Sequence, residues 1–445
     1  MINRTIIRSL VLSLALALLP ITGAVSSPIS DCRIAAAPWQ TVSLGFPIAA
    51  ERLTAKAEPK LMVLPYRLSD RPEYNFGEDA KKDYLAAAEQ IAKFSGGKSK
   101  PTFVFSEVID IPETVADMVI LRQNQQQQWQ RDEAKSTWGF IRRLIALSDP
   151  KIDFTGIDGV IMHGSSTSND SWIAEAMMFS KKPQDPWFRT IPTAEGELLN
   201  AVLLDKRTTI ATIAHEIMHL YGLTDLYGSQ NGPGEHSMMA SNADALLSYE
   251  KWVLGWIPDN QVQCIVERSD IDLAKVATRI TIPASPAEQL VVIKKEKSGT
   301  AYVIDVQTKG AFRMLTFYSL DNEVRPPITL HTTIFNRPSE GITVSNSSGV
   351  GAQLVSSAYT LLVSNNSSTE LTLDLIPKAQ LTNAAALTSA AEANRVRIQA
   401  ELATKPDITV SKPTAKKKTI VCLKGKVKKK VTAVRPKCPA GYKKR

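Results

Sequence analysis

The stretch ATIAHEIMHLYGLTDLYG, residues 211–228, constrains the fold of this chain more than any other feature of its sequence. It holds two of the five histidines, His215 and His219, four positions apart, and Glu216 directly follows the first. Residues i and i+4 lie on one face of a helix, so both imidazoles can reach one metal ion. The spacing predicts a helix that binds Zn2+, with Glu216 as general base beside a zinc-bound water. Five residues are expected to anchor this helix to a core: Ile210, Ile213, Ala214, Ile217 and Tyr221.

The residues after the second histidine supply a turn and a third ligand. Gly222 stands three positions after His219, and glycine tolerates the left-handed conformation that ends a helix. Asp225 follows three positions later, where the chain can return to the same ion. We expect Asp225 to complete the site, and Glu235 and His236 remain as alternative third ligands.

A carboxylate in the ligand set has a chemical consequence. Asp225 is negative, so zinc would keep less net positive charge than it does with three histidines. The bound water would therefore ionise at higher pH, and the reaction would depend more on Glu216. Activity that rises towards mildly alkaline pH is expected.

Two methionines, Met238 and Met239, follow shortly after this segment in the sequence HSMMAS. A methionine-containing turn behind the ligands is typical of the metzincin class of zinc proteases, where it forms a floor beneath the metal. We favour Met239 for that place, although methionine is also a common filler of cores. Four further polar residues are expected to be structural, exposed or at most neighbours of the cleft: His163, His331, Asp170 and Glu175.

Three segments, HEIMHLYGLTDLYG, SMMAS and LLSYEKWVLGWI, together resemble the immune inhibitor A family of secreted bacterial metalloproteases. The resemblance covers about residues 60–260 and is weak beyond them. It implies a metzincin-like zincin domain with zinc at His215, His219 and Asp225 and with Glu216 as base. The IM pair at 217–218 departs from the smaller residues expected there. Members of the family often bind calcium as well, but no clear calcium loop is present in this sequence.

The order of strand-like and helix-like patterns along the chain predicts an α+β protein of several parts. Strand and helix patterns alternate over 60–260, the expected catalytic domain, which includes a buried strand at 60–69 and a helix at 78–94. Short β-rich segments over 265–377 predict a sandwich-like domain. The remaining parts are an N-terminal segment or propeptide (28–59), a helical connector and linker (378–411) and a basic two-cysteine tail (412–445).

The first residues predict export. Arg4 and Arg8 precede an apolar run and then small residues, as in a signal peptide over 1–27. An oxidising compartment and four cysteines favour disulfides, which we expect between Cys422 and Cys438 and, by elimination, between Cys32 and Cys264. In an alternative role, a free Cys32 would cap the metal and keep the enzyme latent.

The net charge of +9 is uneven along the chain. Residues 412–445 hold fourteen Lys or Arg and no acidic residue, whereas 28–411 holds 37 basic and 44 acidic residues. The tail therefore has the charge needed to bind an anionic cell-wall polymer or membrane surface. Nucleic acid is a weaker expectation, because Tyr442 is the tail's one aromatic residue.

These observations favour a secreted zinc endopeptidase that acts on proteins or peptides. Two other functions remain open. One is a wall-associated binding protein whose protease domain is weak or vestigial, although the intact Glu216 argues against it. The other is a zinc amidase that cleaves wall cross-links, which the motif itself does not exclude.

Overall fold

The computed structural model divides the chain into two compact units, residues 1–396 and 397–445. The predicted signal peptide, apart from Thr22–Gly23, and the predicted connector and linker at 378–411 lie outside the described residues. The structure describes residues 22–23, 28–36, 40–128, 136–165, 174–182, 189–205, 208–228, 231–241, 243–267, 278–295, 299–309, 312–337, 341–344, 354–355, 359–366, 370–377, 418–424, 427–433, 437–439 and 442–444.

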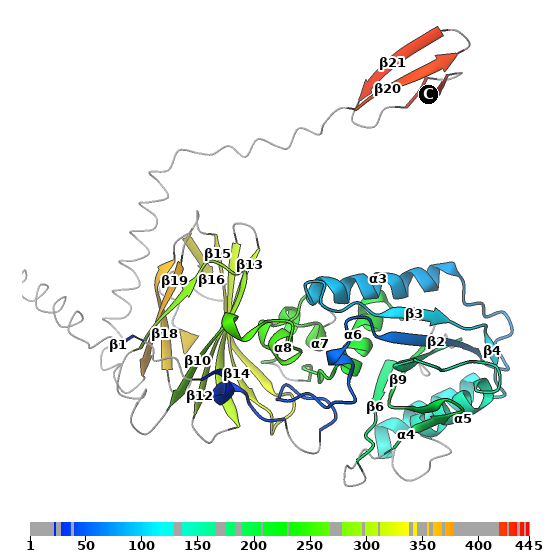
Figure 1. The fold of residues 1–445 in the computed structure, drawn as a ribbon, viewed down its shortest axis with the longest axis horizontal. Coiled ribbons are helices and arrows are strands. Elements are labelled where there is room, and N and C mark those ends of the chain that lie inside the picture. Colours follow the sequence, from blue (N-terminus) through cyan, green and yellow to red (C-terminus); the bar gives the residue numbers. More distant parts are fainter. Residues whose placement is uncertain are drawn as a thin grey trace, which may run out of the picture. The chain divides into compact units, whose positions relative to one another are not determined.

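A six-stranded sheet organises the first half of the larger unit (Figure 1). Its neighbours run parallel except for the last strand, β6, which is antiparallel to β9 and forms one edge. The two-residue strand β4 (Ile109–Asp110) extends the pairing of β2. In spatial order the strands are β3 (Thr102–Phe105), β2 (Lys60–Arg67), β5 (Gly159–Gly164), β9 (Asn200–Asp205) and β6 (Ala174–Met178).

Helices cover both faces of this sheet, which explains why its central strands are apolar throughout. On β2, Leu61 and Val63 join the core beneath α3 (Glu78–Phe94) and α6 (Ile210–Tyr221). The alternate residues Met62 and Leu64 join the core beneath α4 (Val115–Gln128) and α5 (Thr137–Ser148). The result is a mixed α/β arrangement.

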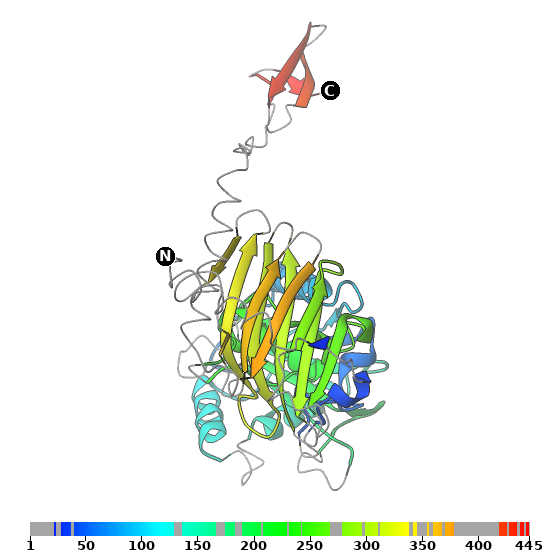
Figure 2. The same ribbon diagram turned by 90° about the vertical axis from the view of Figure 1, so that its left-hand side faces the viewer.

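The β-rich region forms two sheets (Figures 1 and 2). The first has the order β10 (Val262–Glu267), β12 (Glu288–Lys295), β13 (Thr300–Lys309), β14 (Phe312–Asp321), β15 (Ile328–Arg337) and β16 (Gly341–Val344). The second has the order β1 (Thr22–Gly23), β11 (Thr278–Pro283), β19 (Glu370–Pro377), β18 (Tyr359–Asn366) and β17 (Leu354–Val355). Strands within each sheet are antiparallel except for the pairs β1–β11 and β10–β12.

One hydrophobic core joins the two halves of the larger unit. It runs from α6 through α8 (Ser248–Val253), where Trp252 is buried, to Val292 on β12 and Leu320 on β14. The predicted disulfide between Cys32 and Cys264 is confirmed, and it ties the helix α2 (Ile29–Cys32) to β10. Cys32 is therefore committed to a disulfide and has no free thiol to cap a metal.

The smaller unit holds a three-stranded antiparallel sheet in the order β21 (Val427–Ala433), β20 (Lys418–Lys424) and β22 (Lys443–Lys444). The predicted disulfide between Cys422 and Cys438 closes this sheet.

Across the described part of the whole chain, every helix is too short or too polar to cross a membrane. The remaining short elements of that part are β7 (Ile191–Thr193), β8 (Gly196–Leu198), α7 (Met238–Ser241) and three 3-10 helices, Leu53–Ala55, Gly234–His236 and Asp259–Gln261.

Candidate metal centre

Helix α6 carries the two histidines and is fixed at its start by a side-chain cap. The Thr209 hydroxyl accepts a hydrogen bond from the amide of Thr212, which satisfies one of the free N–H groups of the first turn. The predicted anchor residues Ile213, Ala214, Ile217 and Tyr221 are buried. Ile210 is not: it is 38% exposed, because it begins the helix and lies beyond the edge of the core.

Gly222 ends α6 in the left-handed conformation that the sequence predicts. Its φ is 114° and its ψ is 3°, and its amide donates back to the carbonyl of His219. A Cβ atom at this position would lie 2.6 Å from Cγ2 of Ile48, so the turn also needs the small residue for space. This turn sends the chain back towards the histidines.

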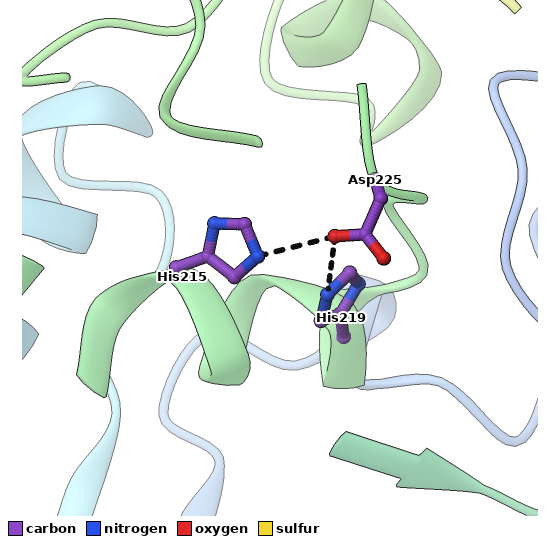
Figure 3. Close-up of side chains that lie close together, drawn as sticks. All are labelled: His215, His219 and Asp225. Carbon is purple, nitrogen blue, oxygen red and sulfur yellow. Dashed lines mark hydrogen bonds and ion pairs between the residues drawn. The ribbon is translucent and has the colours of Figure 1, made fainter. Parts of the chain in front are cut away.

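The structure brings the three predicted ligands together (Figure 3). Oδ1 of Asp225 lies 3.2 Å from Nε2 of His215 and 3.1 Å from Nε2 of His219. The two imidazole rings stand nearly perpendicular, at 86°, so their nitrogens converge from different directions. Among the described residues, this is the one group of three or more His, Cys, Asp or Glu side chains that could hold a metal ion.

Backbone carbonyls fix the tautomer of both histidines. Nδ1 of His215 donates to the carbonyl of Met238 at 2.9 Å, and Nδ1 of His219 donates to the carbonyl of Leu223 at 2.8 Å. A carbonyl only accepts, so the proton of each neutral imidazole lies on Nδ1 and the lone pair on Nε2. In the neutral state each Nε2 can therefore bind a metal ion, whereas a protonated ring donates from Nε2 to Asp225.

The three groups also shape one another's charge. Burial alone would lower the pKa of His219, but the Asp225 carboxylate outweighs it and raises that pKa to about 9. Burial would likewise raise the pKa of Asp225, yet the hydrogen bonds from both histidines hold it well below its usual range. Asp225 is therefore ionised at neutral pH, as a metal ligand must be.

Glu216 lies on the same helix and faces the edge strand of the sheet. It is buried, and its carboxylate accepts a hydrogen bond from the backbone amide of Ala176 on β6. Burial is the largest influence on this group, and it raises the pKa of Glu216 despite the two nearby histidines. A carboxyl whose pKa lies nearer to neutral is better suited to take up and give back a proton.

Tyr227 is a neighbour of the site to which the sequence assigned no role. Its ring stacks on that of His215, with centroids 6.2 Å apart and an interplanar angle of 26°. Its hydroxyl hydrogen-bonds the Asp225 carboxylate, and its side chain is 57% exposed. Its position two residues after the third ligand is the signal that could have identified it.

Both methionines contribute through their main chains. The carbonyl of Met238 orients His215, and the carbonyl of Met239 accepts from the amide of Leu226, next to Asp225, at 2.8 Å. Both side chains are buried in the core. The pair forms the short helix α7 where a tight turn was expected.

The other candidate residues lie outside the metal group. Glu235 and His236 lie in a short 3-10 helix, Gly234–His236, and neither residue belongs to the group His215, His219 and Asp225. His163 is a structural residue: it is buried, Nδ1 lies 2.8 Å from the Tyr84 hydroxyl, and burial lowers its pKa to about 4. His331 packs against Tyr302 and Phe317 in the β-rich region. Glu175 lies on β6, and Asp170 lies outside the described residues.

No protein-family model and no curated protein sequence matches this chain. Among solved structures, the chain is similar to metalloproteinase-II from Bacteroides fragilis. The sequence identity is 16%, the match covers 56% of this chain and 69% of that one, and the TM-score is 0.22. The likeness is distant, and the metal centre stands on its own geometry.

Proposed function

We propose that this chain is a zinc-dependent endopeptidase of a metzincin-like kind. The observation that carries the proposal is the convergence of two imidazole Nε2 atoms on one ionised carboxylate oxygen, at 3.2 and 3.1 Å. Both imidazoles project from helix α6, which also holds Glu216. Structural metal sites use four protein ligands, whereas three ligands leave a position for water or substrate.

The donor set fits zinc. Two histidines and a carboxylate are ligands that zinc prefers, with bonds of about 2.0–2.2 Å. In a tetrahedral site with such bonds, neighbouring donor atoms lie about 3.4 Å apart. The observed separations from Asp225 Oδ1, 3.2 Å to His215 and 3.1 Å to His219, need only a small expansion to accept the ion.

Glu216 is the proton carrier in the proposed reaction. When bound, zinc would supply Lewis acidity that acidifies a water and polarises the scissile carbonyl. The Glu216 carboxylate takes a proton from the attacking water as the new C–O bond forms. It then gives that proton to the peptide nitrogen as the C–N bond breaks, which releases an amine and a carboxylic acid.

The edge strand β6 supports a peptide as substrate. Within the part of the chain that the structure describes, β6 pairs with β9 alone, and its other side can bond an extended chain as an added strand. The hydrogen bond from the Ala176 amide to Glu216 puts the proton carrier beside β6. A peptide paired there would run past Glu216, which favours cleavage within a chain.

We further propose that the protein is exported. The predicted signal peptide at 1–27 and the two disulfides are both consistent with an oxidising, extracellular compartment. An extracellular location agrees with cleavage of proteins or peptides outside the cell.

The proposal is tested by digestion of casein and a peptide library with the purified, zinc-loaded protein. Wild type should cleave both and lose activity with a chelator. Glu216→Gln should retain one zinc per chain and lose at least about 1,000-fold in kcat/KM, because the proton carrier is gone. Glu235→Gln is the matched control: it removes an exposed carboxylate outside the metal group and should leave cleavage unchanged.

Two outcomes oppose the proposal. A wild type that binds one zinc and cleaves no peptide favours the vestigial binding protein, or the wall amidase if purified wall fragments are hydrolysed instead. Equal activity of Glu216→Gln and wild type removes Glu216 from the chemistry.

A further inference from the structure

The smaller unit is a closed, cationic module. Its described part is the sheet of β20, β21 and β22 with the short segment 437–439. The bond between Cys422, which is buried, and Cys438 ties the sheet to that segment, which precedes β22. Residues 412–445 hold fourteen Lys or Arg and no Asp or Glu. No acidic side chain of this segment can therefore neutralise its positive charge.

The charge is concentrated on an exposed edge. Strand β21 lies at the end of the sheet and carries Lys428, Lys429 and Lys430 in succession, all of them exposed. Successive side chains of a strand point to opposite faces, so Lys428 and Lys430 lie on one face and Lys429 on the other. Exposed Lys424 on β20 and Lys437 after β21 add to the same small module.

This arrangement fits a flexible polymer better than a flat surface. A bilayer meets one face of a sheet at a time, whereas a linear chain can follow the edge and reach lysines on both faces. Val421, Leu423 and Val431 are partly buried, and no described large hydrophobic residue of this unit is exposed to insert into a membrane.

The same unit is poorly equipped for nucleic acid. Proteins that bind single strands stack aromatic side chains on the bases, in addition to contacting phosphates. Residues 397–445 contain one aromatic residue, Tyr442, and it is half-buried. Positive charge without a stacking platform favours a polyanion that has no bases.

We propose that residues 418–444 bind a linear polymer of phosphodiester-linked polyols, such as an anionic cell-wall polymer. Lysines on both faces of β21 pair with successive phosphates, and the disulfide between Cys422 and Cys438 closes the sheet to which β21 belongs. The interaction would hold the enzyme at the wall. The proposal goes beyond the peptidase function and does not depend on it.

The test titrates the full chain with purified poly(glycerol phosphate) at several salt concentrations. The triple variant Lys428→Gln, Lys429→Gln, Lys430→Gln should bind about 10- to 100-fold more weakly at 0.1 M salt. The slope of log K against log salt should fall in magnitude by about 2, because each of the three lost phosphate contacts contributes roughly 0.7 to the slope. Replacing the same lysines with Arg should preserve binding, because the charge is kept.

A charge-matched control isolates the module. Lys82→Gln, Lys93→Gln and Lys100→Gln remove the same charge from exposed ion pairs of the larger unit and should leave binding unchanged. Thiol titration establishes whether the Cys422–Cys438 bond is intact in each variant. Wild-type binding that does not weaken with salt overturns the proposal whatever the variants do.

Two further probes separate the classes of partner. Oligo(dT) and vesicles of phosphatidylglycerol with phosphatidylcholine should bind at least tenfold more weakly than poly(glycerol phosphate) at equal phosphate. Equal or tighter binding to either one assigns the module to nucleic acid or to membranes and contradicts the proposal. An equal loss of binding in the tail variant and its control would also contradict it.

Discussion

The carbonyl oxygen of Met238 lies 2.9 Å from Nδ1 of His215. The next carbonyl, that of Met239, accepts from the amide of Leu226 and so supports the segment that holds Asp225. Two consecutive backbone groups therefore brace a helical ligand and the loop ligand. Hydrogen bonds of this kind to the atoms behind a metal ligand orient it and set its tautomer.

This bracing predicts that the two methionine side chains are replaceable. Met238→Leu and Met239→Leu conserve volume in a core and should cost less than about 1.5 kcal/mol each. Zinc affinity, measured by competition with a chromophoric chelator, should stay within a few-fold of wild type. A loss above about tenfold in either variant would show that a methionine side chain supports the metal directly.

Gly222→Ala should be strongly destabilising. The left-handed φ of 114° strains any residue with a Cβ, and that atom would also press on Ile48 at 2.6 Å. Together these should lower the free energy of unfolding by about 2–4 kcal/mol. Urea unfolding of the zinc-free protein measures the change.

Gly228→Ala is the matched control, because Gly228 has a φ of 94° and a Cβ added there would have open space within 4 Å. Gly228→Ala should lower the free energy of unfolding by the backbone strain alone, about 1–2 kcal/mol. Adding Ile48→Ala should restore part of the free energy of unfolding that Gly222→Ala loses. The same addition should restore none of the loss in Gly228→Ala. An equal loss of unfolding free energy in the two glycine variants would mean that the contact with Ile48 does not contribute to the destabilisation.

Tyr227→Phe should weaken zinc binding while it leaves the fold intact. The variant keeps the stacking on His215 but loses the hydroxyl that bonds the Asp225 carboxylate. Lost hydrogen bonds to metal ligands reduce affinity by about 10-fold or more. The same chelator competition measures the effect, and an unchanged melting temperature of the zinc-free protein excludes a general loss of structure. Unaltered affinity would mean that the hydroxyl plays no part in holding Asp225.

Two buried carboxyls connect the β-rich region to the segment behind the metal centre. Asp305 on β13 accepts from the hydroxyl of Ser248 at 2.6 Å, and Glu250 accepts from the hydroxyl of Ser237 at 2.9 Å. Burial raises the pKa of Asp305 to about 7 and that of Glu250 to about 8. Each group therefore holds its proton more tightly in the folded protein than in the unfolded chain.

The sign of the resulting pH dependence follows from linkage. A raised folded-state pKa stabilises the fold fully below about pH 4, and this stability is lost as pH rises through 7 to 8. The free energy of unfolding should fall by roughly 6–7 kcal/mol between pH 5 and 8.5, about 3 kcal/mol from Asp305 and about 4 kcal/mol from Glu250. Glu250→Gln, which does not titrate, should show a flatter curve over urea titrations in this range. Parallel curves for variant and wild type would contradict the assignment.

The residues of the metal group, and the turn that brings them together, could be predicted from the sequence. The spacing of His215 and His219 predicts a shared helix face, and glycine at 222 predicts the turn that returns Asp225 to them. The structure places all three together. Helix 78–94 and both disulfides were likewise predictable, because periodicity and an even cysteine count in an exported chain carry that information.

Features set by tertiary contacts were not predictable in this way. Periodicity put Ile210 on the buried stripe, but the core ends before it. The choice between Met238 and Met239 concerned side chains, whereas the structure uses their carbonyls, which any residue has. The hydrogen bond from Ala176 to Glu216 also depends on strand order, since β6 meets α6 only because it forms the edge beside β9.

The most direct test of the metal centre is anomalous diffraction at the zinc absorption edge from crystals of zinc-loaded protein. We expect one peak in the larger unit, about 2.0–2.2 Å from Nε2 of His215, Nε2 of His219 and a carboxylate oxygen of Asp225. A peak bound by Glu235 or His236 in place of Asp225, or no peak at this site, would contradict the three-ligand centre.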